Sequence, residues 1–100
     1  MVTKVEPIEE QIKKFWGWCG FRSNAMKLSE GGWNYPDGNW DIRLPNLDLN
    51  NLFKYAKPAF IQKYGEGQWA NLLHRWIDTM YQNPSIDPAL ALFWEVIYGN

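Results

Sequence analysis

Hydrophobic residues near the start of the chain recur with the period of an α-helix. They follow the spacing i, i+4, i+7, i+8 and i+11, which places on one helix face Ile8, Ile12, Phe15, Trp16 and Cys19. Pro7 suits an early helical position, and Gly20 followed by Phe21 is typical of a helix stop in which Phe21 folds back on Trp16. The pattern predicts a helix from Pro7 to Cys19, with Trp18 off its buried stripe.

The pattern changes to alternation after residue 32. Trp33 and Tyr35 share one face of a predicted strand, and Trp40 begins the apolar face of a second strand that continues through Ile42 and Leu44. Between them, Pro36-Asp37-Gly38 is a turn sequence. We expect the hairpin to place the aromatic residues opposite one another as cross-strand pairs. The residues from Ala25 to Leu28 also suit a strand.

Helical periodicity returns after Pro45. Asp48 suits an N-cap for a second helix, whose stripe is interrupted at Pro58. Because proline lacks an amide hydrogen and its ring clashes with the carbonyl four residues earlier, a kink or a break into two short helices is expected there. Gly65 and Gly67 are expected to end this segment.

Two further helices are predicted in the last third of the chain. From Trp69 to Met80 the apolar spacing is i, i+3, i+4, i+7, i+8 and i+11, and Ile77 belongs to that buried stripe. Asp87 as a cap and Pro88 as the first helical residue then begin a helix to Tyr98 that is apolar nearly all round. Such a helix is usually buried by the other elements.

These elements predict an α+β fold: an N-terminal helix, a Trp-rich β-hairpin or small antiparallel sheet, then two to three helices with a buried C-terminal helix. Residues 1–100 are expected to form a single compact domain. Seven Trp, five Tyr and five Phe supply a large apolar area for a chain of 100 residues, so the chain is expected to fold alone.

Composition predicts a cytoplasmic protein. No apolar run reaches the roughly 18 residues of a membrane span, the start of the chain is polar where a secretory leader would be apolar, and the lone Cys19 has no partner for a disulfide. The net charge of −1 argues against broad nucleic-acid binding. A local basic stretch remains, which reads either as a solvated helix face or as a phosphate-binding surface: Lys54, Lys57, Lys63 and Arg75.

Catalytic groups are scarce. With a single His and a single Cys, His74 cannot complete a usual zinc site, and Cys19 on an apolar stripe reads as a core residue. Asp37 and Asp41 are the only carboxylate pair to consider, and the turn already explains Asp37. The glycines lack the spacing of a phosphate-binding loop. We therefore predict no enzymatic activity, no metal and no cofactor.

A binding surface is the better prediction, because flat rings lie close to cations along the chain. The candidate residues are Trp18, Arg22, Trp33, Tyr35, Trp40, Arg43, Lys54, Tyr55 and Lys57. Such a set can stack a base and hold its phosphates, or it can anchor a protein partner. The alternative is that the rings are core and the cations are solvated.

Four segments of the chain resemble small uncharacterised proteins encoded by bacteriophages, prophages and other mobile elements. The segments are W-G-W-C-G-F at 16–21, Y-P-D-G at 35–38, L-D-L-N-N-L-F-K-Y-A at 47–56 and D-P-A-L-A-L-F-W-E-V at 87–96. The resemblance spans most of the chain and carries no assigned activity. The order helix, strands, helix is also similar to phage ABA-sandwich proteins, from which the predicted helix at 69–80 departs.

The resemblance implies a phage-borne protein that works by contact, and the leading hypothesis is a non-enzymatic binding protein that counteracts host defence by holding a host protein or a small nucleotide signal. A second hypothesis is a nucleic-acid-binding or replication accessory protein that uses the basic stretch from Lys54 to Arg75. A third is a self-assembling structural protein, a homo-oligomer whose contact uses Trp18 or Trp94.

Overall fold

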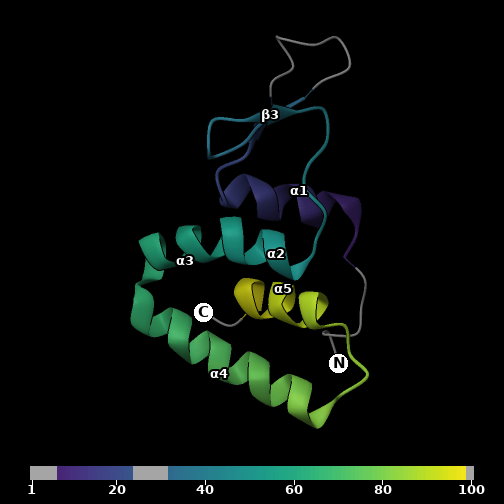
Figure 1. The fold of residues 1–100 in the computed structure, drawn as a ribbon, viewed down its shortest axis with the longest axis vertical. Helices are drawn as coiled ribbons and strands as arrows, with labels where there is room; N and C mark the ends of the chain where they lie inside the picture. Colours follow the sequence, from purple (N-terminus) through teal and green to yellow (C-terminus); the bar gives the residue numbers. More distant parts are fainter. Residues whose placement is uncertain (1–6, 24–31, 99–100) are drawn as a thin grey trace. The chain divides into compact units, whose positions relative to one another are not determined.

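The computed structural model describes residues 7–23 and 32–98, so the strand predicted at Ala25 to Leu28 lies outside the described residues (Figure 1). The described chain is α+β, as predicted, with helices and a small antiparallel sheet. Its contacts divide it into two compact units, which we call the sheet unit, Pro7–Asn46, and the helical unit, which begins at Leu47. The single domain over 1–100 stays a prediction.

The sheet unit begins with helix α1, Glu9–Trp18, which ends as the sequence predicts. Gly20 has φ +111°, its amide donates to the Gly17 carbonyl, and the Phe21 amide donates to the Trp16 carbonyl. These two bonds define a Schellman motif, and the Phe21 ring packs edge-on against Trp16 at 5.2 Å between centroids. Ile8, however, precedes the helix and is 61% exposed, so the buried stripe is shorter than predicted.

Three two-residue strands follow in the order β1-β2-β3, all antiparallel: β1 Arg22–Ser23, β2 Trp33–Asn34 and β3 Trp40–Asp41. The predicted pairing of aromatic residues across the hairpin is wrong, because Trp33 lies opposite Asp41 and Trp40 lies opposite Asn34. Cross-strand neighbours share a face, and successive residues alternate between faces. Trp33 and Trp40 therefore lie on opposite faces of the sheet.

The turn sets this register. The Gly38 amide donates to the Tyr35 carbonyl, Gly38 has φ +91°, and the Tyr35 amide donates to the Asn39 carbonyl at 2.8 Å. The loop therefore holds three residues, in a turn followed by a glycine with positive φ. A change of one residue in register moves a side chain to the other face, so the loop length alone separates the two tryptophans.

In the helical unit, residues 49–64 are continuously helical: α2 Leu49–Asn51, the π-helical segment η2 Leu52–Ala56 and α3 Lys57–Tyr64. Asp48 caps the start as predicted, accepting from the Asn51 amide at 2.9 Å. No break occurs at Pro58. Instead the Lys57 amide donates to the Leu52 carbonyl, five residues earlier, so a π-helical turn comes directly before the proline.

Helices α4, Glu66–Gln82, and α5, Pro88–Tyr98, complete the helical unit. Asp87 caps α5 as predicted, accepting from the amides of Ala89 and Leu90. Helix α5 contributes most to the core of this unit, with Ala91, Leu92 and Phe93 fully buried. The prediction for Ile77 is wrong: it lies on α4 but is 54% exposed. Among residues 7–23 and 32–98, no helix has the length and apolar character that crossing a membrane requires.

Candidate binding groove

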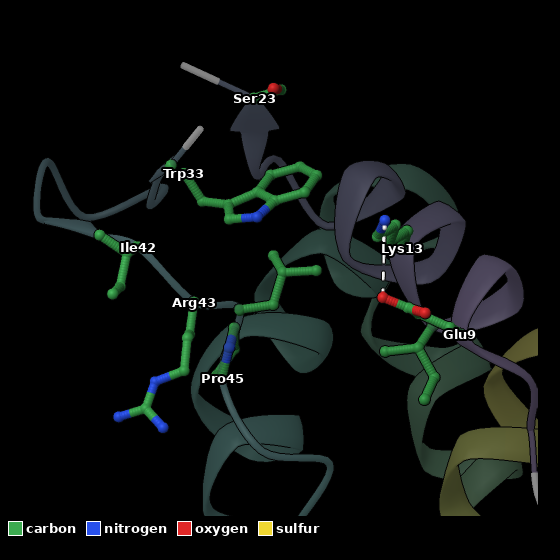
Figure 2. A pocket seen from close by; sticks show the side chains of 10 residues that line it. Glu9, Lys13, Ser23, Trp33, Ile42, Arg43 and Pro45 are labelled. Carbon is green, nitrogen blue, oxygen red and sulfur yellow. Dashed lines mark ion pairs between the residues drawn. The ribbon is translucent and has the colours of Figure 1, made fainter. Parts of the chain in front are cut away.

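The sheet unit carries a groove of about 510 Å³ between one face of α1 and the segments around the sheet (Figure 2). Its lining comes from α1, the sheet and the segment after β3: Glu9, Ile12, Lys13, Ser23, Gly32, Trp33, Ile42, Arg43, Leu44 and Pro45. The volume is in the range of sites that hold small ligands or an anchoring side chain with its neighbours. The lining mixes apolar surface with three charged side chains.

The α1 side of the groove carries an ion pair. Lys13 Nζ lies 3.6 Å from Glu9 Oε2, and both side chains are exposed, at 52% and 84%. The two residues are one helical turn apart, a spacing that brings side chains together on a helix surface. An exposed pair of this kind contributes little to stability, about 0.3 to 0.5 kcal/mol. Its consequence here is electrostatic, because the charge of Lys13 is largely balanced by its neighbour.

Trp33 supplies the largest apolar surface in the groove. It is half-buried, and Figure 2 shows its indole reaching from β2 toward the side that carries Lys13, with Ser23 on one side of the ring and Pro45 on the other. The strand register decides this placement, since it turns Trp33 to the face opposite Trp40. A partly exposed indole in a concave site is the type of side chain that dominates binding energy at interfaces.

Arg43 supplies the cation of the opposite wall. Two backbone bonds hold the residue: the Arg43 amide donates to Asp41 Oδ1 at 3.2 Å, and the Arg43 carbonyl accepts from the Tyr35 hydroxyl at 2.6 Å. Its side chain is exposed and extends away from the Trp33 indole (Figure 2). Within the described residues no ion pair involves its guanidinium. The groove therefore has one cation available to a partner.

The other candidates of the sheet unit lie outside the groove lining. Trp40 is 42% exposed on the other face of the sheet. Arg22 Nη1 donates to the carbonyls of Gly17 at 2.8 Å and Phe21 at 3.0 Å, so this guanidinium covers the carbonyl end of α1. Tyr35 packs edge-on against Phe21 at 4.7 Å between ring centroids, and its hydroxyl donates to the Arg43 carbonyl of the groove wall.

Trp18 is half-buried, with its ring 6.2 Å from that of Phe15. Trp94, which the self-assembly hypothesis names, is 4% exposed and cannot offer an open contact in this structure.

Three candidates belong to the helical unit and do not line the groove: Lys54, Tyr55 and Lys57. Tyr55 is buried, and the Lys54 ammonium lies 5.2 Å from the centroid of its ring, a cation–π contact. Lys57 is exposed. Of the residues predicted for binding, the structure brings only Trp33 and Arg43 together in the groove.

The sequence does not single out most of the groove. Glu9 and Lys13 show the i, i+4 spacing of an ion pair, which many solvated helices share. The alternation predicts Ile42 and Leu44 on the apolar face of a strand, but β3 ends at Asp41 and Ile42 is 58% exposed. In the sequence, Ile42 and Leu44 are recognisable as an apolar pair after β3, but no sequence pattern indicates that they lie near α1.

The groups considered for catalysis have structural roles or stand apart. Burial raises the pKa of the Cys19 thiol to about 12, so the thiol is neutral and a poor nucleophile near pH 7. Asp37 and Asp41 each accept a backbone amide two residues ahead, at 3.1 and 3.2 Å. His74 is exposed on α4. Within the described ranges no three His, Cys, Asp or Glu residues gather as a metal site would require.

No protein-family model, curated protein or solved structure matches this chain.

Proposed function

We propose that this chain is a non-enzymatic binding protein whose groove in the sheet unit holds a segment of a protein partner. The observation that carries the proposal is the combination of the half-buried Trp33 indole, apolar neighbours such as Leu44, and the Arg43 cation in one concave site. Trp and Arg are the residues enriched among those that dominate protein interfaces. A partner segment would place an apolar side chain against Trp33 and an acidic side chain near the Arg43 guanidinium.

The arrangement of the cations favours a protein segment over a nucleotide. A stacked base needs a ring face, and its phosphates need cations that converge close to that ring. Lys13 is balanced by Glu9, and Arg43 extends away from the indole (Figure 2). The sequestration of a small nucleotide, with which the sequence is equally compatible, therefore has less support from the described residues.

The setting of the proposal comes from the resemblance to phage and mobile-element proteins. On that resemblance, the proposed partner is a host-cell protein and the proposed consequence of binding is interference with host defence. The groove supports the binding step, and the resemblance alone supports the setting.

Selection of peptides against the full chain tests the binding step. A display library of random 12-residue peptides should yield sequences that carry an acidic residue next to a large apolar one. Trp33→Ala and Arg43→Ala should each weaken these peptides by roughly tenfold or more, since a central Trp or Arg contact is often worth at least about 2 kcal/mol. Trp40→Ala is the matched control, because this exposed indole lies on the other face of the sheet.

Two outcomes would contradict the proposal: no peptide is enriched, or the enriched peptides bind the groove variants as tightly as the original protein.

Titration with cyclic dinucleotides and ADP-ribose, monitored by calorimetry and Trp fluorescence, tests the nucleotide alternative. Binding of these compounds that is lost with Trp33→Ala would replace the protein partner with a nucleotide.

A further inference from the structure

Helix α4 carries a second stripe of residues that its own unit does not use. Four exposed positions, each four or three residues after the last, form it: Ala70, His74, Ile77 and Tyr81. Ile77 is 54% exposed and Tyr81 is 86% exposed, which is high for large apolar side chains. The spacing of four, three and four residues keeps all of them on one face of an α-helix.

This stripe is distinct from the face of α4 that builds the core. Trp69 and Leu72 are buried, and α4 contacts both α3 and α5. Figure 1 shows α3 and α5 on the same side of α4. Residues of the second stripe lie about 100° around the helix axis from Trp69, at 100° per residue. The helix therefore has a core face that its unit covers and a second, partly apolar face, with Ile77 and Tyr81 exposed, that its unit leaves uncovered.

We propose that α4 pairs antiparallel, about a two-fold axis, with α4 of a second copy of this chain. The axis would pass between His74 and Ile77, the middle of the stripe. In this register Ala70 of each copy lies opposite Tyr81 of the other, so the smallest residue of the stripe faces the largest, twice by symmetry. A large side chain over a small one is how two helices interdigitate at close approach.

The polar edge of the stripe is complementary in the same register. Asn71 and Asp78, both exposed, lie on one edge, and in this register Asn71 of one copy lies about 3 Å along the helix direction from Asp78 of the other. The amide of Asn71 can therefore donate to the carboxylate of the other copy's Asp78. The half-buried Leu73 and Met80 lie on the other edge and widen the apolar contact. A strip that is complementary to itself after a two-fold rotation fits a second copy of this chain.

The size of the contact sets its strength. Helix α4 has 17 residues and is about 25 Å long, so a single pair of such helices buries less than a standard protein interface. The dimer is accordingly weak, with a dissociation constant on the order of 100 µM. It does not depend on the groove of the sheet unit, so the two proposals stand or fall separately.

Sedimentation equilibrium of the full chain between about 10 µM and 1 mM should show monomer and dimer. Tyr81→Glu should weaken the dimer roughly 100-fold, because the change enters twice in a two-fold contact. Gln68→Glu is the matched control: it adds the same charge at an exposed position of α4 away from the stripe and should leave the dimer unchanged. Both positions are exposed, and circular dichroism would confirm that each variant is folded.

Cysteine crosslinking tests the antiparallel register. In a mixture of Ala70→Cys and Tyr81→Cys proteins, oxidation should join one variant to the other. Each variant alone should stay uncrosslinked. In this register the two copies of either position lie about 16 Å apart along the helix direction, which is beyond the reach of a disulfide. Cys19 is buried and does not compete. A monomer at every concentration, a dimer that Tyr81→Glu does not affect, or crosslinks within each single variant would overturn the proposal.

Discussion

The helical unit and the sheet unit use their tryptophans differently. In the helical unit, Trp69 and Trp94 are buried, and the half-buried Trp76 donates its indole N–H to the Pro88 carbonyl at 3.0 Å. In the sheet unit only Trp16, on helix α1, is buried, while Trp18 and Trp33 are half-buried and Trp40 is exposed. A strand of two residues offers too little surface to cover an indole, whereas a long amphipathic helix has a complete apolar face.

This difference separates stability from function. The helical unit has a continuous core in which α5 is surrounded, and its tryptophans serve that core. The sheet unit keeps large rings at its surface, where they contribute little to stability and are available to a partner. We therefore locate the proposed binding in the sheet unit, and the following changes test how far the two units differ.

The largest effect is expected in the core of the helical unit. Phe93 is fully buried on α5, so Phe93→Ala should lower the free energy of unfolding by about 3–5 kcal/mol through lost burial and a cavity. Trp40→Ala, which removes an even larger but exposed ring, should cost less than about 1 kcal/mol. Urea denaturation followed by circular dichroism measures both. Equal costs would show that the two units do not differ in this way.

The second largest change in stability is expected at Gly20, which ends α1 in the sheet unit. Gly20 has φ +111°, and a Cβ there would lie 3.4 Å from Cγ of Pro36, so Gly20→Ala should destabilise by about 2 kcal/mol. Gly17→Ala is the control, because Gly17 lies within α1 and has open space around it. That change should stabilise by about 0.5–1 kcal/mol. Thermal denaturation should thus show shifts of opposite sign, and two shifts of the same sign would contradict the structure.

A third effect appears at alkaline pH. Burial raises the pKa of Cys19 from 9.0 to about 12, so between these values the folded thiol keeps a proton that the unfolded thiol loses. Rising pH then favours the unfolded state, and between pH 8 and pH 10 this group should remove about 1.4 kcal/mol of stability. The Cys19→Ala variant should lack this loss. If the stability of both proteins falls equally over this range, the thiol is not buried as described.

The smallest effect concerns the helix caps, where the two units again differ. Asp87 accepts two amides at the start of α5, so Asp87→Ala should cost about 1 kcal/mol. Helix α1 has Ile8 at its cap, exposed and without a side-chain cap bond, so Ile8→Ser should stabilise that helix by a few tenths of a kcal/mol. Hydrogen exchange of the first helical turns would report each change locally. A Ser at residue 8 without any gain in protection would argue against this capping geometry.

Local signals in the sequence predicted the fold class and most helix ends. The caps at Asp48 and Asp87 and the glycine stop after α1 each depend on residues within one helical turn, so the sequence contains everything needed to recognise them. Of the kink or break expected at Pro58, the break does not occur, because a π-helical turn before the proline keeps the segment helical. The sequence pattern does not reveal that adjustment, in which Tyr55 is buried together with Leu52 and Ala56.

The candidate site was less predictable. Residue type identifies Trp33 and Arg43 as suited to binding, but no pattern in the sequence connects them to Glu9, Lys13 and Leu44, which line the same groove. Arg22 has the same residue type, yet its guanidinium donates to the Gly17 carbonyl of α1 and to the Phe21 carbonyl beyond the helix. Residue type shows what a side chain can do, but not which neighbour it will meet.

The sequence by itself determined that this chain forms an α+β fold with helices of known position, because helix formation follows from periodicity and from caps that act over a few residues. Only the tertiary structure decided which tryptophan enters the groove and which face of α4 stays open. The first depends on a turn of three residues that sets the strand register, and the second on which flank of α4 its neighbours cover. The second is a set of contacts between separate helices, and the first is a one-residue choice of register that the apolar alternation of the two strands does not specify.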